Sequence, residues 1–143
     1  MTESYVRDGH WTAERTVDFW LRNAARRPDA PALEDERECY SWASGARAIE
    51  AIASGLVDAG IPRDGILLTQ AQNSALYVLL RLACEQAGII LAFLHAGFRQ
   101  GEITAVARRV SPVGAVIGSD GKSDLLPTYQ ALGQEIGLKH LFT

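Results

Sequence analysis

Apolar residues recur at helical spacing near the start of the chain. Four of them would share one side of a helix: Val17, Trp20, Leu21 and Ala24. We expect the side chain of Thr16 to cap this helix and Pro28 to end it. Two short extended runs follow at 31–34 and 38–42. The charged residues between them predict a small hairpin with a solvated tip.

Helical and extended patterns then alternate to the end of the chain. The expected helices cover 41–60, 74–87, 100–110 and 124–136, and the expected strands cover 66–69, 89–94, 113–117 and 140–142. The strand at 89–94 is apolar throughout, which is typical of a strand covered on both faces. The alternation predicts an α/β fold: an open, mainly parallel sheet flanked by helices, with a small N-terminal hairpin. We interpret residues 1–15 as a loose leader and residues 16–143 as a single α/β domain that stops after its last strand.

The composition excludes several classes of protein. With 48% hydrophobic and 22% charged residues, the chain is expected to be globular. Its net charge of −3 gives no basic surface for nucleic acid, and its most apolar stretch is too interrupted to span a membrane. The two cysteines, Cys39 and Cys84, both have apolar neighbours in sequence. They predict buried thiols in a reducing compartment, and therefore a cytoplasmic location.

Candidate chemistry is sparse. In parallel sheets ligands bind beyond the carboxyl ends of the strands, which here are the segments 70–73, 95–99 and 118–122. His95 lies at one of these ends, although a loop histidine without a catalytic role is the simpler interpretation. Gly118–Ser123 ends in Gly-Lys-Ser like a phosphate loop, but Val116 stands where the first glycine is needed. We expect an ordinary turn there, and the sequence shows neither a catalytic set nor a group of metal ligands.

An ordered set of short motifs runs through most of the chain. They lie at 16–32, Cys39–Ala43, Ala53–Gly60, Gln70–Asn73, Ala83–Ile90 and Phe98–Ile103. Taken in order, they resemble the N-terminal part of the adenylate-forming enzymes, the superfamily of AMP-dependent acyl- and aryl-CoA synthetases. The resemblance is greatest to CoA ligases for cyclic, aromatic or medium-chain acids. Gln72 stands where this family usually has Pro, and His95-Ala96 stands where it usually has Asn-Pro.

The resemblance implies a two-step ligase reaction for the parent enzyme. A carboxylate attacks ATP to form an acyl-adenylate, and the CoA thiol then displaces AMP. ATP, Mg and CoA are the cofactors that it implies for the parent, with none expected to bind this chain alone. The family's phosphate loop, its nucleotide motifs and its catalytic lysine lie downstream of the matching region. No catalytic residue is therefore assigned here, and Arg99 is a candidate contact for a CoA phosphate.

Three interpretations stay open at this point. The chain could be the N-terminal part of an acyl-CoA ligase, inactive alone, whose partner is the missing remainder of the adenylation domain. This predicts apolar surface at the edge of the sheet. It could instead be a stand-alone binding or assembly module derived from that fold, for which a homodimer is one expected assembly. The third interpretation is a small nucleotide-binding protein that uses Gly118–Ser123.

Overall fold

The larger of the two sheets has four parallel strands in the order β4-β3-β5-β6. Its strands are β3 (Ile66–Gln70), β4 (Ile90–Phe93), β5 (Gly114–Ile117) and β6 (His140–Phe142). These come from a computed structural model of the chain, which describes residues 2–118 and 125–143. The predicted open, parallel α/β sheet is therefore confirmed. Because β3 pairs with both β4 and β5, it is an interior strand of this sheet.

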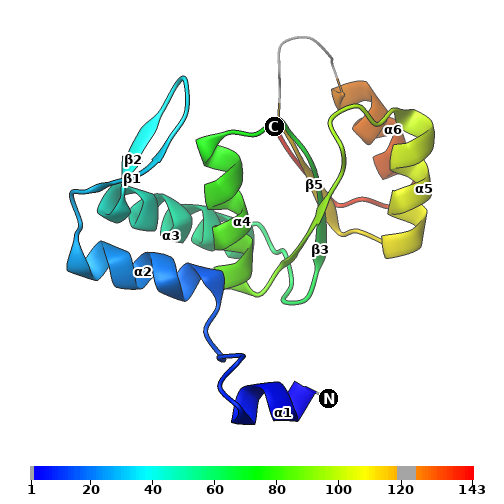
Figure 1. Cartoon of the computed structure of the whole chain (residues 1–143). Coiled ribbons are helices and arrows are strands. Elements are labelled where there is room, and N and C mark those ends of the chain that lie inside the picture. The colour runs from blue at the N-terminus through cyan, green and yellow to red at the C-terminus, as the bar shows by residue number, and fades with distance from the viewer. Residues whose placement is uncertain (1, 119–124) are drawn as a thin grey trace.

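Helices cover both faces of this sheet, as Figure 1 shows. One face packs against α4 (Ala75–Ala87), and the other packs against α5 (Gln100–Val110) and α6 (Leu126–Ile136). Successive residues of β3 alternate between these layers, as strand geometry requires. Leu67 packs in a cluster with Leu80 of α4, whereas Leu68 packs in a cluster with Ile103 of α5.

A third layer packs on the outer side of α4. It contains α2 (Thr16–Arg26), α3 (Trp42–Asp58) and a two-stranded antiparallel hairpin of β1 (Pro31–Glu34) and β2 (Cys39–Ser41). Val17, Ile49 and Leu79 are buried where the three helices meet. The indole N–H of Trp20 donates a hydrogen bond to the Trp42 carbonyl at 3.0 Å. The predicted hairpin and helices of this region are confirmed.

Two helix starts show different sources of capping. The Ser41 hydroxyl accepts a hydrogen bond from the Ser44 backbone N–H at 3.2 Å and caps α3. The predicted Thr16 side-chain cap on α2 is wrong, because Thr16 is already the first helical residue. The Glu85 carboxylate of α4 instead accepts hydrogen bonds from the backbone N–H groups of Thr16 at 2.8 Å and Val17 at 3.2 Å. A carboxylate is favourable at this positive end of a helix.

The expectation that residues 89–94 are covered on both faces is wrong for Ile90 and Phe93. β4 is an edge strand that pairs only with β3 among the described strands. The side chains of Ile90 and Phe93 are 50% and 51% exposed. Phe93 contacts the ring of Tyr77 from α4, with ring centroids 5.4 Å apart. Edge position, rather than sequence pattern, sets the exposure of this apolar strand.

Two further expectations need correction. Cys39 is exposed on β2, at the edge of the small hairpin, and only Cys84 is buried. The N-terminal segment contains a short helix, α1 (Thr2–Arg7), where the sequence pattern indicated no element. The ring of Tyr5 in this helix stacks on Trp11 at a centroid distance of 5.6 Å. The pattern of apolar positions did not reveal this helix.

Candidate functional site

The parallel strands β3 and β4 end side by side, on the side of the sheet that we call its carboxyl edge. Open parallel sheets bind ligands beyond this edge. Gln70 is the last residue of β3, and the segment after β4 turns at His95–Phe98 before α5 begins. The N–H of Phe98 donates to the His95 carbonyl at 2.9 Å, which closes this turn. The turn delivers the chain from the buried Leu94 to Arg99.

A single buried amide organises this edge. The side-chain Nε2 of Gln70 lies 3.1 Å from the His95 carbonyl oxygen, 3.2 Å from that of Ala96 and 3.0 Å from that of Phe98. Gln70 is 1% exposed. An amide nitrogen carries two hydrogens, so the three carbonyls share them. The side chain thus joins the end of β3 to the whole 95–98 turn.

The other end of the same amide reaches α6. The Tyr129 hydroxyl donates a hydrogen bond to Gln70 Oε1 at 3.1 Å. Tyr129 is 0% exposed, and burial raises the pKa of its hydroxyl above the ordinary range, so the phenol stays protonated and remains a donor. Sequence reasoning identified Gln70 only as the start of a loop and gave Tyr129 no role. A polar residue closing a buried strand was the available signal.

His95 and Arg99 both belong to this edge and are both exposed. His95 Nδ1 accepts a hydrogen bond from the Gly97 backbone N–H at 3.0 Å. The backbone N–H of Arg99 donates to the Glu102 carboxylate at 2.9 Å, and hydrogen bonding of this kind lowers the pKa of Glu102. Within residues 2–118 and 125–143, the Arg99 guanidinium forms no ion pair. Its side chain is exposed to solvent.

The glycine-rich segment after β5 is described only at its first residue. Gly118 follows β5, and its N–H donates to the Gln70 carbonyl at 3.0 Å. A Cβ at this position would lie 2.6 Å from the Cβ of Ala71, so the close approach requires glycine. Residues 119–124, including Lys122, lie outside the described residues. The interpretation of Gly118–Ser123 as an ordinary turn stays a prediction.

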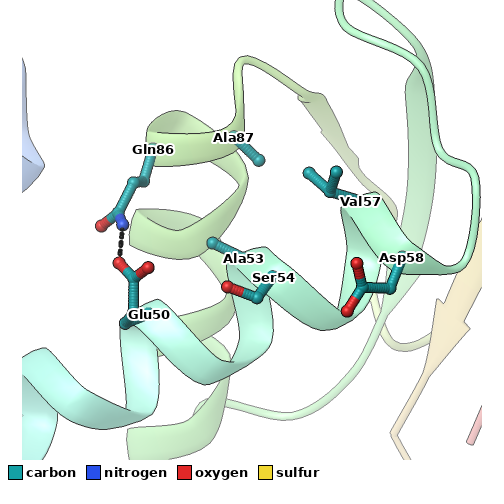
Figure 2. Close-up of a pocket in the computed structure, with 7 residues that line it drawn as sticks. All are labelled: Glu50, Ala53, Ser54, Val57, Asp58, Gln86 and Ala87. Carbon is teal, nitrogen blue, oxygen red and sulfur yellow. Dashed lines mark hydrogen bonds between the residues drawn. The ribbon is translucent and has the colours of Figure 1, made fainter.

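A concave surface lies between α3 and α4 (Figure 2). This shallow groove has a volume of about 260 Å³. Glu50 and Asp58 contribute carboxylates to its lining, and the Gln86 amide donates a hydrogen bond to Glu50 across the groove. Negative charge of this kind disfavours a nucleotide phosphate. The groove is therefore a poor site for ATP or CoA.

Between residues 2–118 and 125–143, no three His, Cys, Asp or Glu side chains gather closely enough to hold one metal ion. None of the helices in that part of the chain combines the length and apolar character needed to cross a bilayer.

The sequence of this chain matches a known protein family and several curated proteins. Residues 20–139 match the family model described as AMP-binding enzyme. The chain is 29% identical over 119 residues to Protein Y of Streptomyces griseus, covering 79% of this chain and 39% of that protein. It is 32% identical over 125 residues to the mitochondrial medium-chain acyl-CoA ligase ACSF2 of Mus musculus, covering 84% of this chain and 20% of that protein.

Solved structures show the same arrangement of elements. The apo structure of MbtA from Mycobacterium smegmatis superposes with a TM-score of 0.84 at 25% identity, covering 97% of this chain and 26% of that one. The coronafacic acid ligase of Pectobacterium brasiliense superposes with a TM-score of 0.80 at 16% identity, covering 90% of this chain and 25% of that one. The chain therefore spans well under half the length of these relatives.

Proposed function

Because this chain belongs to the family of AMP-binding enzymes, we propose that it is the N-terminal part of an ATP-dependent acyl-CoA ligase and is not catalytic alone. The observation that carries the proposal is the match of residues 20–139 to this family. The chain covers only 39% of one curated relative and 20% of another. The exposed apolar ends of β4 also support it, since an edge strand of this kind suits further protein packed against it. The partner is then the remainder of the adenylation domain.

The reaction proposed for the complete ligase has two displacement steps. A carboxylate oxygen of the acid attacks the α-phosphorus of ATP, which gives an acyl-adenylate and pyrophosphate. The CoA thiolate then attacks the acyl carbonyl carbon, and AMP leaves with the electrons of the broken C–O bond. Both steps need cationic groups beside the phosphates, which Mg and lysine or arginine side chains supply. The substrate proposed is a medium-chain, cyclic or aromatic acid, and the location proposed is the cytoplasm.

Arg99 is the residue of this chain that best fits a ligand of the complete ligase. We propose that its guanidinium contacts a phosphate of CoA. Its exposure, its lack of an ion pair among the described residues and its position at the carboxyl edge support this assignment. A guanidinium binds phosphate oxygens through two parallel N–H groups. The exposed position fits a contact at the entrance of a site better than a contact with a transferring phosphoryl group.

A stand-alone binding or assembly module is the second candidate function. The burial of both faces of β3 favours it, because Leu67 on one face and Leu68 on the other are each 0% exposed. Such a module would be monodisperse, as a monomer or a homodimer, and would melt cooperatively. Light scattering after size-exclusion chromatography and calorimetric melting test it. A polydisperse, aggregating chain with no cooperative transition would contradict this second candidate.

Pyrophosphate exchange tests the main proposal. We expect no exchange above background from the 143-residue chain with ATP, Mg and a panel of medium-chain and aryl acids. The coding sequence should then be read past the codon for Thr143, and any longer product assayed in the same way. Exchange by the short chain would contradict the proposal that it is inactive alone. A stop codon after Thr143 would favour the second candidate.

The assignment of Arg99 needs the longer product. Losing one charge-assisted phosphate contact should raise KM for CoA about tenfold in Arg99→Ala. Pyrophosphate exchange should not change, because that half-reaction does not use CoA. Arg109→Ala is a matched control, since Arg109 is also exposed but lies in the last turn of α5. Equal KM values for the two variants would refute the Arg99 contact.

A further inference from the structure

We propose that Gln70 is a positioning residue, whose side-chain amide holds the 95–98 turn in the orientation from which His95 and Arg99 face the carboxyl edge of the sheet. The proposal goes beyond the Arg99 assignment because it names the group that fixes the turn. Its structural part stands on the hydrogen bonds of Gln70. Only its consequence for CoA binding rests on the proposed function.

Gln70 is a fixed point for the turn because it belongs to β3. β3 is paired on both sides, so its backbone is held by two neighbouring ladders. The three carbonyls that share Nε2 belong to residues spread over the whole turn, from His95 to Phe98. If the amide were removed, the carbonyls of Ala96 and Phe98 would need another donor, whereas that of His95 would keep the Phe98 N–H. The direction of the chain into Arg99, the next residue after Phe98, is therefore tied to an interior strand.

The three carbonyls and Tyr129 together make the orientation of this amide unique. Exchanging the nitrogen and oxygen of Gln70 would place Oε1 against three carbonyl oxygens and would leave the Tyr129 hydroxyl facing an NH₂ group. With Tyr129 donating to Oε1, the NH₂ group must point into the turn. Through this contact, α6 on one face of the sheet helps to set the geometry of a turn on another segment of the chain.

Amide hydrogen exchange of the 143-residue chain tests the structural part. In Gln70→Glu at neutral pH, the carboxylate cannot donate to the turn. We expect protection at Gly97, Phe98 and Arg99 to fall at least about tenfold, relative to the change at the interior of β5. Gln134→Glu is the control, because it makes the same chemical change at an exposed position of α6. Unchanged protection, or a loss no larger than that in β5, would overturn the proposal.

Acidification of Gln70→Glu separates donation from packing. Burial raises the pKa of such a carboxyl, and the protonated acid has the shape of the amide and again carries a donor hydrogen. Protection at Phe98 should therefore recover as pH falls, measured against wild type at each pH so that the intrinsic pH dependence of amide exchange cancels. A side chain that mattered only by filling space would show no recovery, and that result would refute the role of the amide.

Tyr129→Phe keeps the test usable if Gln70→Glu does not fold at neutral pH. This variant retains the ring in the core and removes only the hydroxyl that orients the amide. We expect a smaller loss of protection confined to the same three amides. Protection equal to wild type at these amides would count against the proposal.

The consequence for ligand binding is measured in the longer product. Gln70→Leu should raise KM for CoA about tenfold while leaving pyrophosphate exchange near the wild-type rate. If Arg99→Ala leaves KM for CoA unchanged, the proposed CoA contact is wrong. The amide hydrogen exchange measurements still decide the role of Gln70. If Arg99→Ala raises KM and Gln70→Leu does not, the turn does not need Gln70 to present Arg99, and the positioning role is refuted.

Discussion

The Asp35 carboxylate accepts a hydrogen bond from the backbone N–H of Ala75 at 2.7 Å. This bond joins the tip of the β1–β2 hairpin to the first turn of α4, although the two residues are 40 positions apart. Asp35 also accepts hydrogen bonds from the backbone N–H groups of Arg37 and Glu38, both at 2.8 Å. These bonds, that from Ala75 foremost, lower the pKa of the Asp35 carboxyl. The hairpin tip is thus held by its carboxylate and is not merely solvated.

Asp35→Asn should weaken the connection between the hairpin and α4. It should also make the free energy of unfolding less dependent on pH in the acid range. A carboxyl whose pKa is lowered on folding stabilises the protein above its unfolded pKa, about 3.9 for Asp, and this contribution is lost as pH falls through the folded value. We expect the variant to have a lower free energy of unfolding at pH 7 and a smaller loss between pH 5 and pH 2. Urea unfolding followed by circular dichroism measures both. The control is Glu36→Gln at the same tip, and identical pH profiles for Asp35→Asn and wild type would contradict the prediction.

Two glycines of α3 should respond in opposite directions to alanine. A Cβ on Gly45 would lie 2.3 Å from Cζ2 of Trp20, so Gly45→Ala must displace the indole and should cost about 1–3 kcal/mol. A Cβ on Gly55 meets nothing within 4 Å, so Gly55→Ala should stabilise the chain by about 0.5–1 kcal/mol through helix propensity. Thermal unfolding measures both changes, and tryptophan fluorescence reports the displaced ring. Equal effects would show that the contact with Trp20 yields readily.

The buried hydroxyl of Thr69 should be dispensable. Its Oγ1 has no hydrogen-bond partner among the described residues, and the residue is 0% exposed. Thr69→Val replaces this unpaired hydroxyl with a methyl group, so it should leave stability unchanged or raise it by up to about 1 kcal/mol. Thr69→Ser keeps the hydroxyl and loses the methyl, which should cost about 1 kcal/mol. A Thr69→Val variant that is less stable than Thr69→Ser would mean that Oγ1 has a partner in solution.

The two thiols should differ sharply toward a disulfide reagent. Cys39 is exposed and should react in the native protein. Burial raises the pKa of the Cys84 thiol to about 12 and shields it, so Cys84 should react only on unfolding. Spectrophotometric titration should therefore find one reactive thiol in buffer and two in denaturant. In Cys39→Ser the native signal should vanish, and a remaining fast thiol would place Cys84 at the surface.

Hydrophobic periodicity predicted the elements well because it is a local property. The helix expected at 100–110 is observed as α5 over the same residues, and Gly88, expected to end a helix, has the left-handed φ of 73°. The pattern failed where a distant residue decides the outcome. Thr16 does not cap α2 because Glu85, from another helix, already binds the helix end. β4 is half exposed because strand order places it at an edge, and apolar composition does not encode strand order.

The candidate site was predicted in location more than in composition. The rule that ligands bind at the carboxyl ends of parallel strands indicated His95, and the family resemblance indicated Arg99. The structure places these two residues on one turn and at its exit. The group that organises this turn was missed. Gln70 acts through residues 25 to 28 positions later and through Tyr129, 59 positions later, and no local pattern relates them.

The strand order β4-β3-β5-β6 also suits the order in which a ribosome delivers the chain. β3 emerges first, β4 then adds to one side of it, β5 adds to the other side, and β6 adds beyond β5. Each new strand attaches to a free edge, and none has to insert between two strands that are already paired. The sheet can therefore grow outward during translation without breaking hydrogen bonds made earlier.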